Sequence, residues 1–439
     1  MAGQQCPRTV STKLQMVAEL SRQEPQRAWT NLAHHIDMDF LRAAFGRVRK
    51  DGAPGVDGQT AAEYAKDLDA NLATLLHRFK SGTYQAPPVR RVYVPKDDGR
   101  QRPIGIPTFE DKILQRAVMM VLEAIYEQDF LDCSYGFRSG RSAHQALERL
   151  FRGLMDMWGG YVIELDIKSF FDAMSHAHMR TFLDKRVRDG VIRRAIDKWL
   201  KAGALEAGAV RRMEAGSPQG GVISPLLANV YLHEVLDLWF EREVRPRMHG
   251  RCFMVRYADD AVLVFETEED ARRVFAVLAQ RFARFGLELH PDKTRLVPFR
   301  SPRRWSKPPA NDSKNGPGSF DFLGFTHHWG RSLKGHDMVK RRTATKRFSR
   351  ALRRINEWCR IHRHKYVADQ HRELSAKLRG HYGYYGIRGN WERLTAFQYK
   401  VRSIWHKWLG RRSQKAGMPW TDFKRMLEQH PLPTPTVTF

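Results

Sequence analysis

Three aspartates stand out because each ends or interrupts a run of apolar residues that favour β-strands. Asp166 ends the stretch YVIELD at 161–166, and Asp259 and Asp260 lie in the middle of FMVRYADDAVLVF at 253–265. Apolar residues on both sides of this adjacent pair predict a β-hairpin with the two acids at its tip. Neighbouring side chains of a straight strand point to opposite faces, whereas a tight turn lets both carboxylates approach one site. Asp166, at the end of the other buried strand, is a natural partner for Asp259.

Carboxylates gathered in this way suit hard divalent cations, which offset the repulsion between the acids. Three such groups can hold two Mg²⁺ ions about 4 Å apart, an arrangement suited to in-line displacement at phosphorus. One ion activates a hydroxyl nucleophile and the other neutralises the leaving group. The alternative for Asp259 and Asp260 is ordinary turn chemistry, because aspartate is a favoured turn residue. Asp172, six residues after Asp166, fits a capping or structural role better than a metal site.

Basic residues are concentrated in the last quarter of the chain. The 439 residues carry 75 Lys+Arg and 48 Asp+Glu, a formal net charge of +27, and residues 331–439 alone contribute 26 basic and 7 acidic residues. A polyphosphate partner suits such a segment, because each neutralised phosphate releases condensed counterions. Aromatic residues are interleaved there, and bases of unpaired RNA stack on such rings, although tryptophans at helical spacing are commonly core residues. We therefore expect a nucleic-acid partner; a solvated helical face and an anionic membrane surface are the alternatives.

Other classes of protein are disfavoured by length, hydropathy and cysteine usage. The chain is longer than one compact core normally fills, and 42% of its residues are hydrophobic, so two or three lobes are expected. The N-terminal residues lack an apolar signal region, and no run of about 18 apolar residues occurs, which argues against secretion and membrane insertion. The widely spaced Cys6, Cys133, Cys252 and Cys359 form no C-x-x-C pair, so neither a zinc module nor a disulfide scaffold is expected. A reducing, cytoplasmic setting fits best.

Helices and strands are both expected around these residues. Residues 1–85 read as helical with a turn-rich loop at 50–58, and Asp97-Asp98-Gly99 marks a hairpin between two β-favouring stretches at 89–107. A glycine-rich turn opens an apolar helix within 215–232.

The later part of the chain is expected to be largely helical. Residues 301–319 are rich in Pro, Gly, Ser and Asn and predict an exposed loop. Residues 340–412 show the pattern of two or three basic amphipathic helices.

Three segments resemble, in chain order, the palm motifs of reverse transcriptases: DIKSFFD at 166–172, GSPQGGVISP at 216–225 and YADD at 257–260. Their residues are similar in particular to those of the bacterial group II intron-encoded reverse transcriptases, in the branch that lacks an endonuclease. In many relatives the chain continues into a zinc-supported H-N-H endonuclease. Only 27 residues follow Arg412 here and they contain no cysteine, so second-strand cleavage is not expected.

Five further segments resemble other parts of the same branch. GVDG at 55–58 and RPIGIP at 102–107 resemble its finger motifs, and HPDKT at 290–294 and FLGF at 322–325 its later palm motifs. RGHYGYYGIRGN at 379–390 resembles the signature of the maturase, or X, domain.

The resemblance implies an α+β fold, a right-hand polymerase with fingers and palm followed by a mainly helical thumb/maturase (X) domain. We expect an N-terminal extension and the start of the fingers at 1–85, and the reverse transcriptase fingers and palm at 86–325. The basic thumb/X domain is expected at 326–412 and a short tail without an endonuclease domain at 413–439.

The implied function is RNA-directed DNA synthesis from dNTPs onto a primer 3′-hydroxyl with two Mg²⁺ ions, together with binding of group II intron RNA during splicing and mobility. The expected partners are that intron RNA, an RNA template, a DNA primer or target and dNTPs, with no membrane. The protein would be cytoplasmic and bacterial, and associated with the nucleoid when acting on DNA. One alternative is a maturase-only splicing cofactor, against which the intact acids argue. The other is a reverse transcriptase domesticated for a cellular role such as defence, against which the basic domain and residues 379–390 argue.

Roles for individual residues follow from the resemblance. Asp166 and Asp259 become metal ligands and Asp260 the third catalytic acid. Phe171 falls where an aromatic ring would exclude a ribose 2′-hydroxyl, and a buried strand-end phenylalanine is equally consistent with its position. Lys293 would donate a proton to pyrophosphate or simply contact a phosphate. The expected dNTP-binding residues are Lys96, Arg102, Phe171, Gln219 and Lys293.

The remaining assignments concern primer and RNA. The primer grip is expected at Phe322, Leu323 and Gly324. For His381, packing or RNA contact is favoured over metal binding, because no second His or Cys lies at ligand spacing. The expected RNA-binding residues are Arg341, Arg342, Lys346, Arg347, Arg379, His381, Tyr384 and Tyr385.

Overall fold

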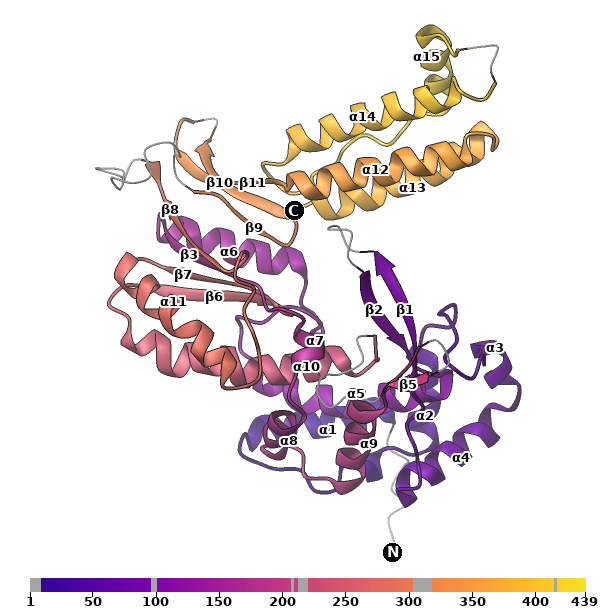
Figure 1. The fold of residues 1–439 in the computed structure, drawn as a ribbon, viewed down its shortest axis with the longest axis vertical. Coiled ribbons are helices and arrows are strands. Elements are labelled where there is room, and N and C mark those ends of the chain that lie inside the picture. The colour runs from indigo at the N-terminus through magenta and orange to yellow at the C-terminus, as the bar shows by residue number, and fades with distance from the viewer. Residues whose placement is uncertain are drawn as a thin grey trace, which may run out of the picture. The chain divides into compact units, whose positions relative to one another are not determined.

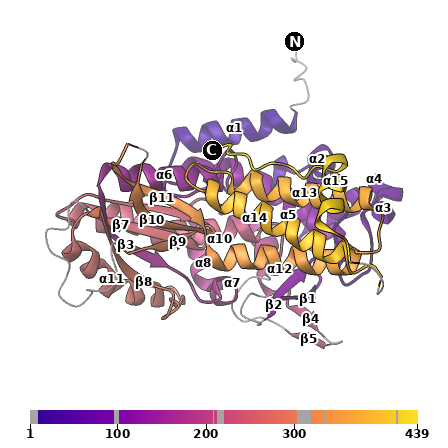
Figure 2. The same ribbon diagram turned by 90° about the horizontal axis from the view of Figure 1, so that it is seen from above.

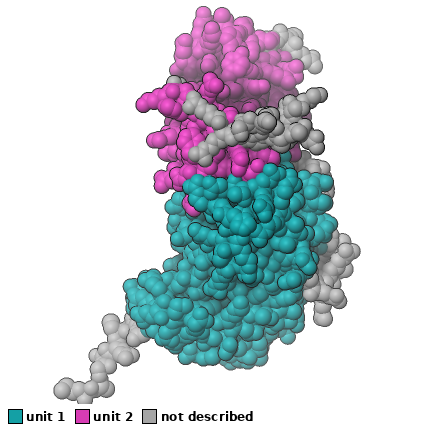
Figure 3. All heavy atoms as spheres, turned by 90° about the vertical axis from the view of Figure 1, so that its left-hand side faces the viewer, with its two compact units in different colours: residues 1–146, 165–296 teal, residues 147–164, 297–439 magenta. Residues whose placement is uncertain are grey.

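The protein has a mixed α/β fold with a largely helical C-terminal region. The computed structural model describes residues 9–95, 101–206, 209–211, 220–302, 318–332, 334–413 and 417–439. The chain forms two compact units (Figure 3). Unit 1 comprises Met1–Ala146 and Leu165–Leu296, and unit 2 comprises Leu147–Glu164 and Val297–Phe439. These units do not follow the boundaries expected from the sequence, and the division into fingers, palm and thumb stays a prediction.

Helices make up most of unit 1, and the longest of them, α5 (Phe109–Asp129), lies in its core. Apolar residues occupy every side of α5, as expected for a buried helix, and α1 and α2 pack against it. Within the described part of the chain, no helix is both long and apolar enough to cross a membrane. The other helices of unit 1 are α1 (Val10–Gln23), η1 (Leu32–His35), α2 (Met38–Arg47), α3 (Ala61–Tyr64), η2 (Ala65–Asp67), α4 (Leu68–Ser81), α7 (Phe170–Ala173), α8 (His176–Asp184), α9 (Gly190–Lys201), α10 (Ser224–Leu232), η3 (His233–Asp237), η4 (Phe240–Val244), η5 (Arg245–Arg247) and α11 (Glu268–Ala283).

A four-stranded sheet in unit 1 has the order β2-β1-β4-β5. β1 (Val89–Pro95) pairs antiparallel with β2 (Gln101–Ile106), which confirms the hairpin expected around Asp97-Asp98-Gly99 (Figure 1). The turn itself, including Lys96, lies outside the described residues. β4 (Ala204–Glu206) pairs parallel with β1 and antiparallel with β5 (Ala209–Arg211).

A second four-stranded sheet, of order β6-β7-β3-β8, contains the strands that lead to the three aspartates. β6 (Cys252–Tyr257) and β7 (Asp260–Phe265) are joined as an antiparallel hairpin. Their side chains, like those of β3 (Gly159–Leu165), are buried almost throughout, which explains their continuous apolar sequence. The fourth strand is β8 (Arg295–Arg300).

Unit 2 contains a helical bundle with its own core. α12 (Thr345–His362), α13 (Val367–Tyr385) and α14 (Trp391–Leu409) lie side by side, which confirms the helices expected at 340–412 (Figure 1 and Figure 2). α6 (Ala143–Asp156) begins in unit 1 and continues into unit 2. The fully buried members of the bundle core are Cys359, Leu374, Leu378, Leu394, Val401, Trp405 and Phe423.

Strands precede this bundle where the sequence indicated a mainly helical domain from residue 326. β10 (Phe325–Arg331) pairs antiparallel with β11 (Asp337–Thr343) and with β9 (Phe320–Phe322). Burial alternates along both long strands, but the inward positions include His327 and Arg341. Because polar residues fill part of the buried face, the alternation of hydrophobicity that announces a strand is hidden in the sequence.

The segment expected to be a short C-terminal tail contains a helix, α15 (Trp420–Gln429). Phe423 is fully buried in the bundle core, and Met426 and Leu427 pack against the same core. Apolar residues three and four positions apart form one face of this helix, and this spacing could have predicted the helix from the sequence.

A buried polar cluster links α5 to two other parts of unit 1. Asp111 is only 3% exposed and accepts hydrogen bonds from the Tyr84 hydroxyl, from Trp199 Nε1 at 2.7 Å and from Gln115 Nε2 at 2.9 Å. Gln115 Oε1 in turn accepts from the backbone N–H of Ile223 at 3.3 Å. Burial raises the pKa of Asp111 to about 6, although all three donors act in the opposite direction.

Replacing Asp111 with asparagine should remove a pH dependence of stability. Between its ordinary pKa of 3.8 and about 6, the folded protein holds a proton on Asp111 that the unfolded chain does not. The free energy of unfolding of the wild type, relative to Asp111→Asn, should therefore fall by about 2 kcal/mol between about pH 4.5 and about pH 7.5. Urea unfolding followed by tryptophan fluorescence measures this difference.

The exposed Asp132, whose side chain is 97% accessible, provides the matched control. Asp132→Asn should keep the pH dependence of the wild type. Parallel stability curves for wild type and Asp111→Asn would contradict the assignment of the extra proton to Asp111.

Candidate active site

Asp166 lies directly after β3 and is held in place by the segment 290–294. Its carbonyl oxygen accepts from the His290 N–H at 2.8 Å and from Thr294 Oγ1 at 3.2 Å, and its own N–H donates to Thr294 Oγ1 at 3.3 Å. The carboxylate is about one-third exposed and accepts from Lys293 Nζ at 3.1 and 3.3 Å. The backbone of Asp166 is therefore fixed while its carboxylate stays accessible.

Asp259 lies in the two-residue turn of the β6–β7 hairpin, as the sequence predicted. Tyr257 pairs with Asp260, so Ala258 and Asp259 form the turn. Ala258 has a φ of 58°, in the left-handed region that tight hairpin turns require. Asp259 is half-buried and Asp260, the first residue of β7, is exposed.

The charges of Asp166 and Asp259 act on each other. Burial raises the pKa of Asp259, and the negative charge of Asp166 raises it further, while the charges of Arg102 and Arg256 oppose this shift. Asp166 therefore acts electrostatically on Asp259, and the strands that lead to them, β3 and β7, are neighbours in one sheet. Two nearby carboxylates with hard oxygen donors fit a divalent cation, which would relieve their repulsion. Over the described residues, no three His, Cys, Asp or Glu side chains form a group that could already hold a metal ion.

The other residues expected to bind dNTP are distributed as follows. Arg102 lies on β2, exposed, and its charge reaches Asp259. Phe171, in the short helix α7, is half-buried with its ring centroid 5.4 Å from that of Phe170. Lys293 is engaged with Asp166, while Lys96 and Gln219 lie outside the described residues.

A close backbone approach explains one glycine of the 216–225 motif. Gly220 has a φ of 121°, and a Cβ atom there would lie 2.4 Å from the carbonyl oxygen of Gly105 in β2. A side chain would therefore force this segment away from the β1–β2 hairpin.

The segment expected to form the primer grip makes a tight turn in unit 2. Phe322 is buried at the end of β9, and Leu323 and Gly324 both have positive φ. The Tyr384 hydroxyl donates to the Leu323 carbonyl at 2.8 Å, and the Tyr384 ring stacks on Phe325. Tyr384, expected to contact RNA, therefore braces this turn.

The residues expected to bind RNA fall into two groups. Arg341 is only 6% exposed; its guanidinium pairs with Glu148 at 3.6 Å and lies over the Phe151 ring, and this burial argues against RNA contact. His381 stacks on Phe397 with ring centroids 3.8 Å apart, which favours packing over ligation. Burial lowers the pKa of His381 to about 4. Tyr385 is half-buried against Phe325. The exposed members are Arg342, Lys346, Arg347 and Arg379.

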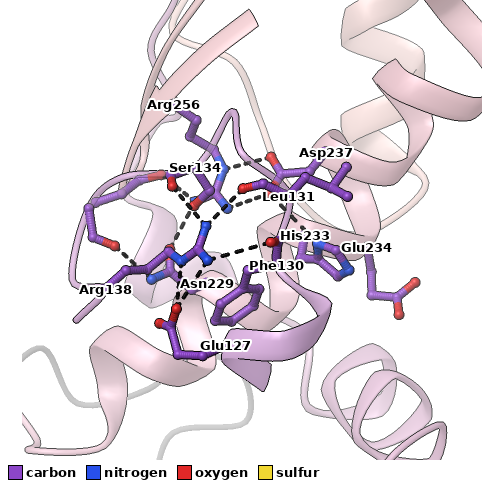
Figure 4. A network of polar contacts seen from close by, with 12 residues as sticks. Glu127, Phe130, Leu131, Ser134, Arg138, Asn229, His233, Glu234, Asp237 and Arg256 are labelled. Carbon is purple, nitrogen blue, oxygen red and sulfur yellow. Dashed lines mark hydrogen bonds and ion pairs between the residues drawn. The ribbon is translucent and has the colours of Figure 1, made fainter. Parts of the chain in front are cut away.

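A buried ion pair beneath the hairpin was missed by sequence reasoning. Arg256, the residue before Tyr257, is fully buried and pairs with Asp237 at 2.5 Å (Figure 4). Its signal was an arginine inside the apolar strand FMVRY, since a charged residue in a buried strand requires a partner.

Similarity to known proteins identifies the family of this chain. A family model described as reverse transcriptase (RNA-dependent DNA polymerase) matches residues 94–327. Protein YkfC of Escherichia coli K12 is 42% identical over 241 residues, covering 48% of this chain and 63% of the relative. The group II intron-encoded protein LtrA of Lactococcus lactis is 39% identical over 203 residues, covering 44% and 33%. A nuclear intron maturase 2 of Arabidopsis thaliana mitochondria is 31% identical over 180 residues, covering 31% and 24%.

The chain spans less than two thirds of the length of each of these relatives. The family model, by contrast, covers more than half of the chain and includes Asp166, Asp259 and Asp260. The protein therefore belongs to the reverse transcriptase family of RNA-dependent DNA polymerases.

Proposed function

We propose that the chain is an RNA-directed DNA polymerase that also binds a group II intron RNA and assists its splicing and mobility. The observation that carries the polymerase proposal is that β3 and β7, which lead to Asp166 and to the 257–260 turn, are neighbouring strands inside the family-matched region. The names of two relatives, a group II intron-encoded protein and an intron maturase, support the choice of RNA partner.

In this proposal Asp166 and Asp259 are the ligands of two Mg²⁺ ions, with Asp260 as the third acid. Bound there, the ions would neutralise phosphoryl charge and activate the primer 3′-hydroxyl. Lys293 exchanges its contact with Asp166 for a phosphate of the departing pyrophosphate. Since a partly exposed ion pair contributes only about 0–1 kcal/mol, this exchange costs little.

The incoming nucleotide is proposed to lie between the β1–β2 hairpin and the aspartates of unit 1. Lys96 and Arg102 contact the triphosphate through charge-assisted hydrogen bonds, and Gln219 lies beside the nascent base pair. The ring of Phe171 excludes a ribose 2′-hydroxyl. The support for this arrangement is the electrostatic effect of Arg102 on Asp259 and the tight packing of Gly220 on Gly105.

The domain organisation proposed with this function is a right hand. Fingers and palm occupy 86–325 after an N-terminal extension, and the thumb/X domain follows with its basic helices. The turn at 322–324 supports the primer end, and the exposed residues Arg342, Lys346, Arg347 and Arg379 contact RNA.

Removing either central acid should abolish DNA synthesis without unfolding the protein. Asp166→Asn and Asp259→Asn each eliminate a charge needed for metal binding, and primer extension on an RNA template should fall by at least about 10³-fold. The thermal midpoint should stay equal or rise, because the repulsion between the two carboxylates disappears. Chelation of Mg²⁺ should abolish extension by the wild type in the same assay.

The control for charge is Glu269→Gln, an exposed acid in the first turn of α11 that should leave extension unchanged. RNA binding by the two aspartate variants should stay within a few-fold of the wild type. Collapse of RNA binding together with loss of extension would mean that the acids are structural.

Shortening Phe171 should relax discrimination against ribonucleotides. Without its ring, a 2′-hydroxyl fits, so the ratio of kcat/KM for dNTP over rNTP should fall by at least about tenfold, whereas dNTP incorporation falls less. Single-nucleotide incorporation measures both. Phe275→Ala, a partly exposed phenylalanine on α11, is the matched control, and equal ratios for the two variants would refute the assignment.

Charge reversal on the exposed basic residues of unit 2 should weaken RNA binding. With Arg342, Lys346 and Arg347 changed to glutamate, affinity should fall at least about tenfold and the salt slope of log K should flatten by about two, near 0.7 per lost phosphate contact. Filter binding at several salt concentrations tests this, with Arg272→Glu on α11 as control.

An unchanged slope in the triple variant would remove this surface from the RNA interface. A folded wild type that binds intron RNA and promotes splicing but extends no primer would favour the maturase-only alternative. Extension without preference for an intron RNA would favour a role outside splicing.

A further inference from the structure

A single buried arginine connects the Asp259 turn to two polar side chains beneath it. Arg256 Nε and Nη2 donate to the two carboxylate oxygens of Asp237, at 2.7 and 2.5 Å. Its Nη1 donates to Asn229 Oδ1 at 2.9 Å (Figure 4) and to the carbonyl oxygen of Ala258 at 3.0 Å. The side chain is fully buried, and these three partners accept hydrogen bonds from four of its five N–H groups.

The two side-chain partners come from one continuous helical segment, α10 followed by η3. Asn229 and Asp237 are eight residues apart, and in a regular α-helix they would differ by about 80° around the axis. η3 is a π-helical turn that ends at Asp237, and one extra residue per turn reduces this offset to about 20°. The π turn thus brings both side chains to the face that meets Arg256.

The positive charge of Arg256 is permanent in this setting. Burial alone lowers the pKa of Arg256, but the Asp237 carboxylate outweighs it and raises the pKa overall. The other neighbour of Asp237 is His233, whose pKa is lowered by burial, so its imidazole is neutral near pH 7. Arg256 is therefore the group that balances Asp237.

The backbone around the turn is enclosed from a second side. A Cβ atom on Gly136 would lie 2.3 Å from the Ala258 nitrogen, and Asn229 Nδ2 donates to the Gly136 carbonyl at 2.8 Å. The Tyr135 N–H donates to the Arg256 carbonyl at 2.8 Å. Asn229 thus fixes both Arg256 and the turn at Gly136 against which Ala258 packs.

Ala258 needs this support because its conformation is unfavourable. A φ of 58° brings Cβ close to the backbone, and residues other than glycine adopt it rarely. The Arg256 guanidinium holds the Ala258 carbonyl in the orientation that goes with this φ, and the next residue is Asp259. A different φ at Ala258 would redirect Asp259 away from Asp166.

We propose that Arg256 is a positioning residue for DNA synthesis: together with Asp237 and Asn229 it holds Ala258 in the left-handed conformation that directs Asp259 toward Asp166. The proposal rests on the proposed catalytic role of Asp259. This positioning role differs from a purely structural role, because it attributes the loss of DNA synthesis in an Arg256 variant to a change in the φ angle of Ala258.

A double-mutant cycle with glycine isolates that angle. Arg256→Lys keeps a cation for Asp237, but one ammonium cannot also hold Asn229 and Ala258, so kcat for primer extension should fall about 30-fold with KM for template–primer within about threefold. Glycine adopts positive φ freely, so adding Ala258→Gly should recover about tenfold of that loss. Ala258→Gly alone completes the cycle.

Arg138 supplies the control. It too is a buried arginine, paired with Glu127 at 3.0 Å and bonded to the carbonyls of Leu131 and Ser134 (Figure 4). Among the described residues the hydrogen bonds and ion pair of its side chain go to residues 127–134 and not to Ala258 or Asp259. Arg138→Lys should lower the thermal midpoint as Arg256→Lys does. Adding Ala258→Gly to Arg138→Lys should raise neither its thermal midpoint nor its activity. Equal response of both arginine variants to Ala258→Gly, or no rescue of Arg256→Lys, would overturn the proposal.

Amide hydrogen exchange makes the test independent of catalysis. In the single variant Arg256→Lys, peptides covering 253–265 should exchange their amide hydrogens faster than in the wild type. Unchanged exchange there would overturn the positioning role. An inactive wild type whose Arg256→Lys variant shows the faster exchange would instead overturn the polymerase function alone. Should Arg256→Lys fail to fold, Asn229→Ala, which leaves the Asp237 pair intact, should lose about tenfold in kcat and be rescued by Ala258→Gly; absence of rescue counts against the proposal.

Discussion

The site of unit 1 depends on two carboxylates of like charge, Asp166 and Asp259, being held in a partly buried region despite their repulsion. Asp166 and Asp259 come from different strands, and each raises the free energy of the other as an anion. Left to relax, the two side chains would separate into solvent. The fold instead fixes the backbone on both sides, through the 290–294 segment at Asp166 and through the enclosed turn at Asp259.

The side chains that hold the backbone around this site are themselves polar and buried, so each of them needs hydrogen-bond partners. Each buried donor or acceptor needs a partner, because an unsatisfied one costs about 1–3 kcal/mol. Arg256, Asp237 and Asn229 find partners in one another and in the carbonyls of Ala258 and Gly136, and Asp111 has three donors. Such networks have few alternative arrangements, so they specify geometry more strictly than apolar packing does.

Sequence reasoning reached the parts of the molecule that depend on local pattern. The apolar runs around Asp166 and at 253–265 predicted the strands and the hairpin tip, and helical spacing predicted α12–α14. Beyond the pairing of Asp166 with Asp259, it did not predict contacts between residues distant in the chain, such as Lys293 with Asp166 or Arg256 with Asp237. The strands β10 and β11 were not predicted for another reason: their buried faces carry His327 and Arg341 in place of apolar residues. The burial of Arg341 likewise depends on Glu148 and Phe151, which no local pattern connects to it.

The ion pair between Lys293 and Asp166 gives the site a counter-ion of its own. A lysine attached to the chain neutralises one acid without requiring any ion from solution, so the two carboxylates need not repel at full strength while the chain folds. Both partners are partly exposed, and such a pair is weak enough to be replaced. In the proposed function, metal binding at this site is an exchange of one cation for another, so the protein can fold tightly without the metal and still bind it readily.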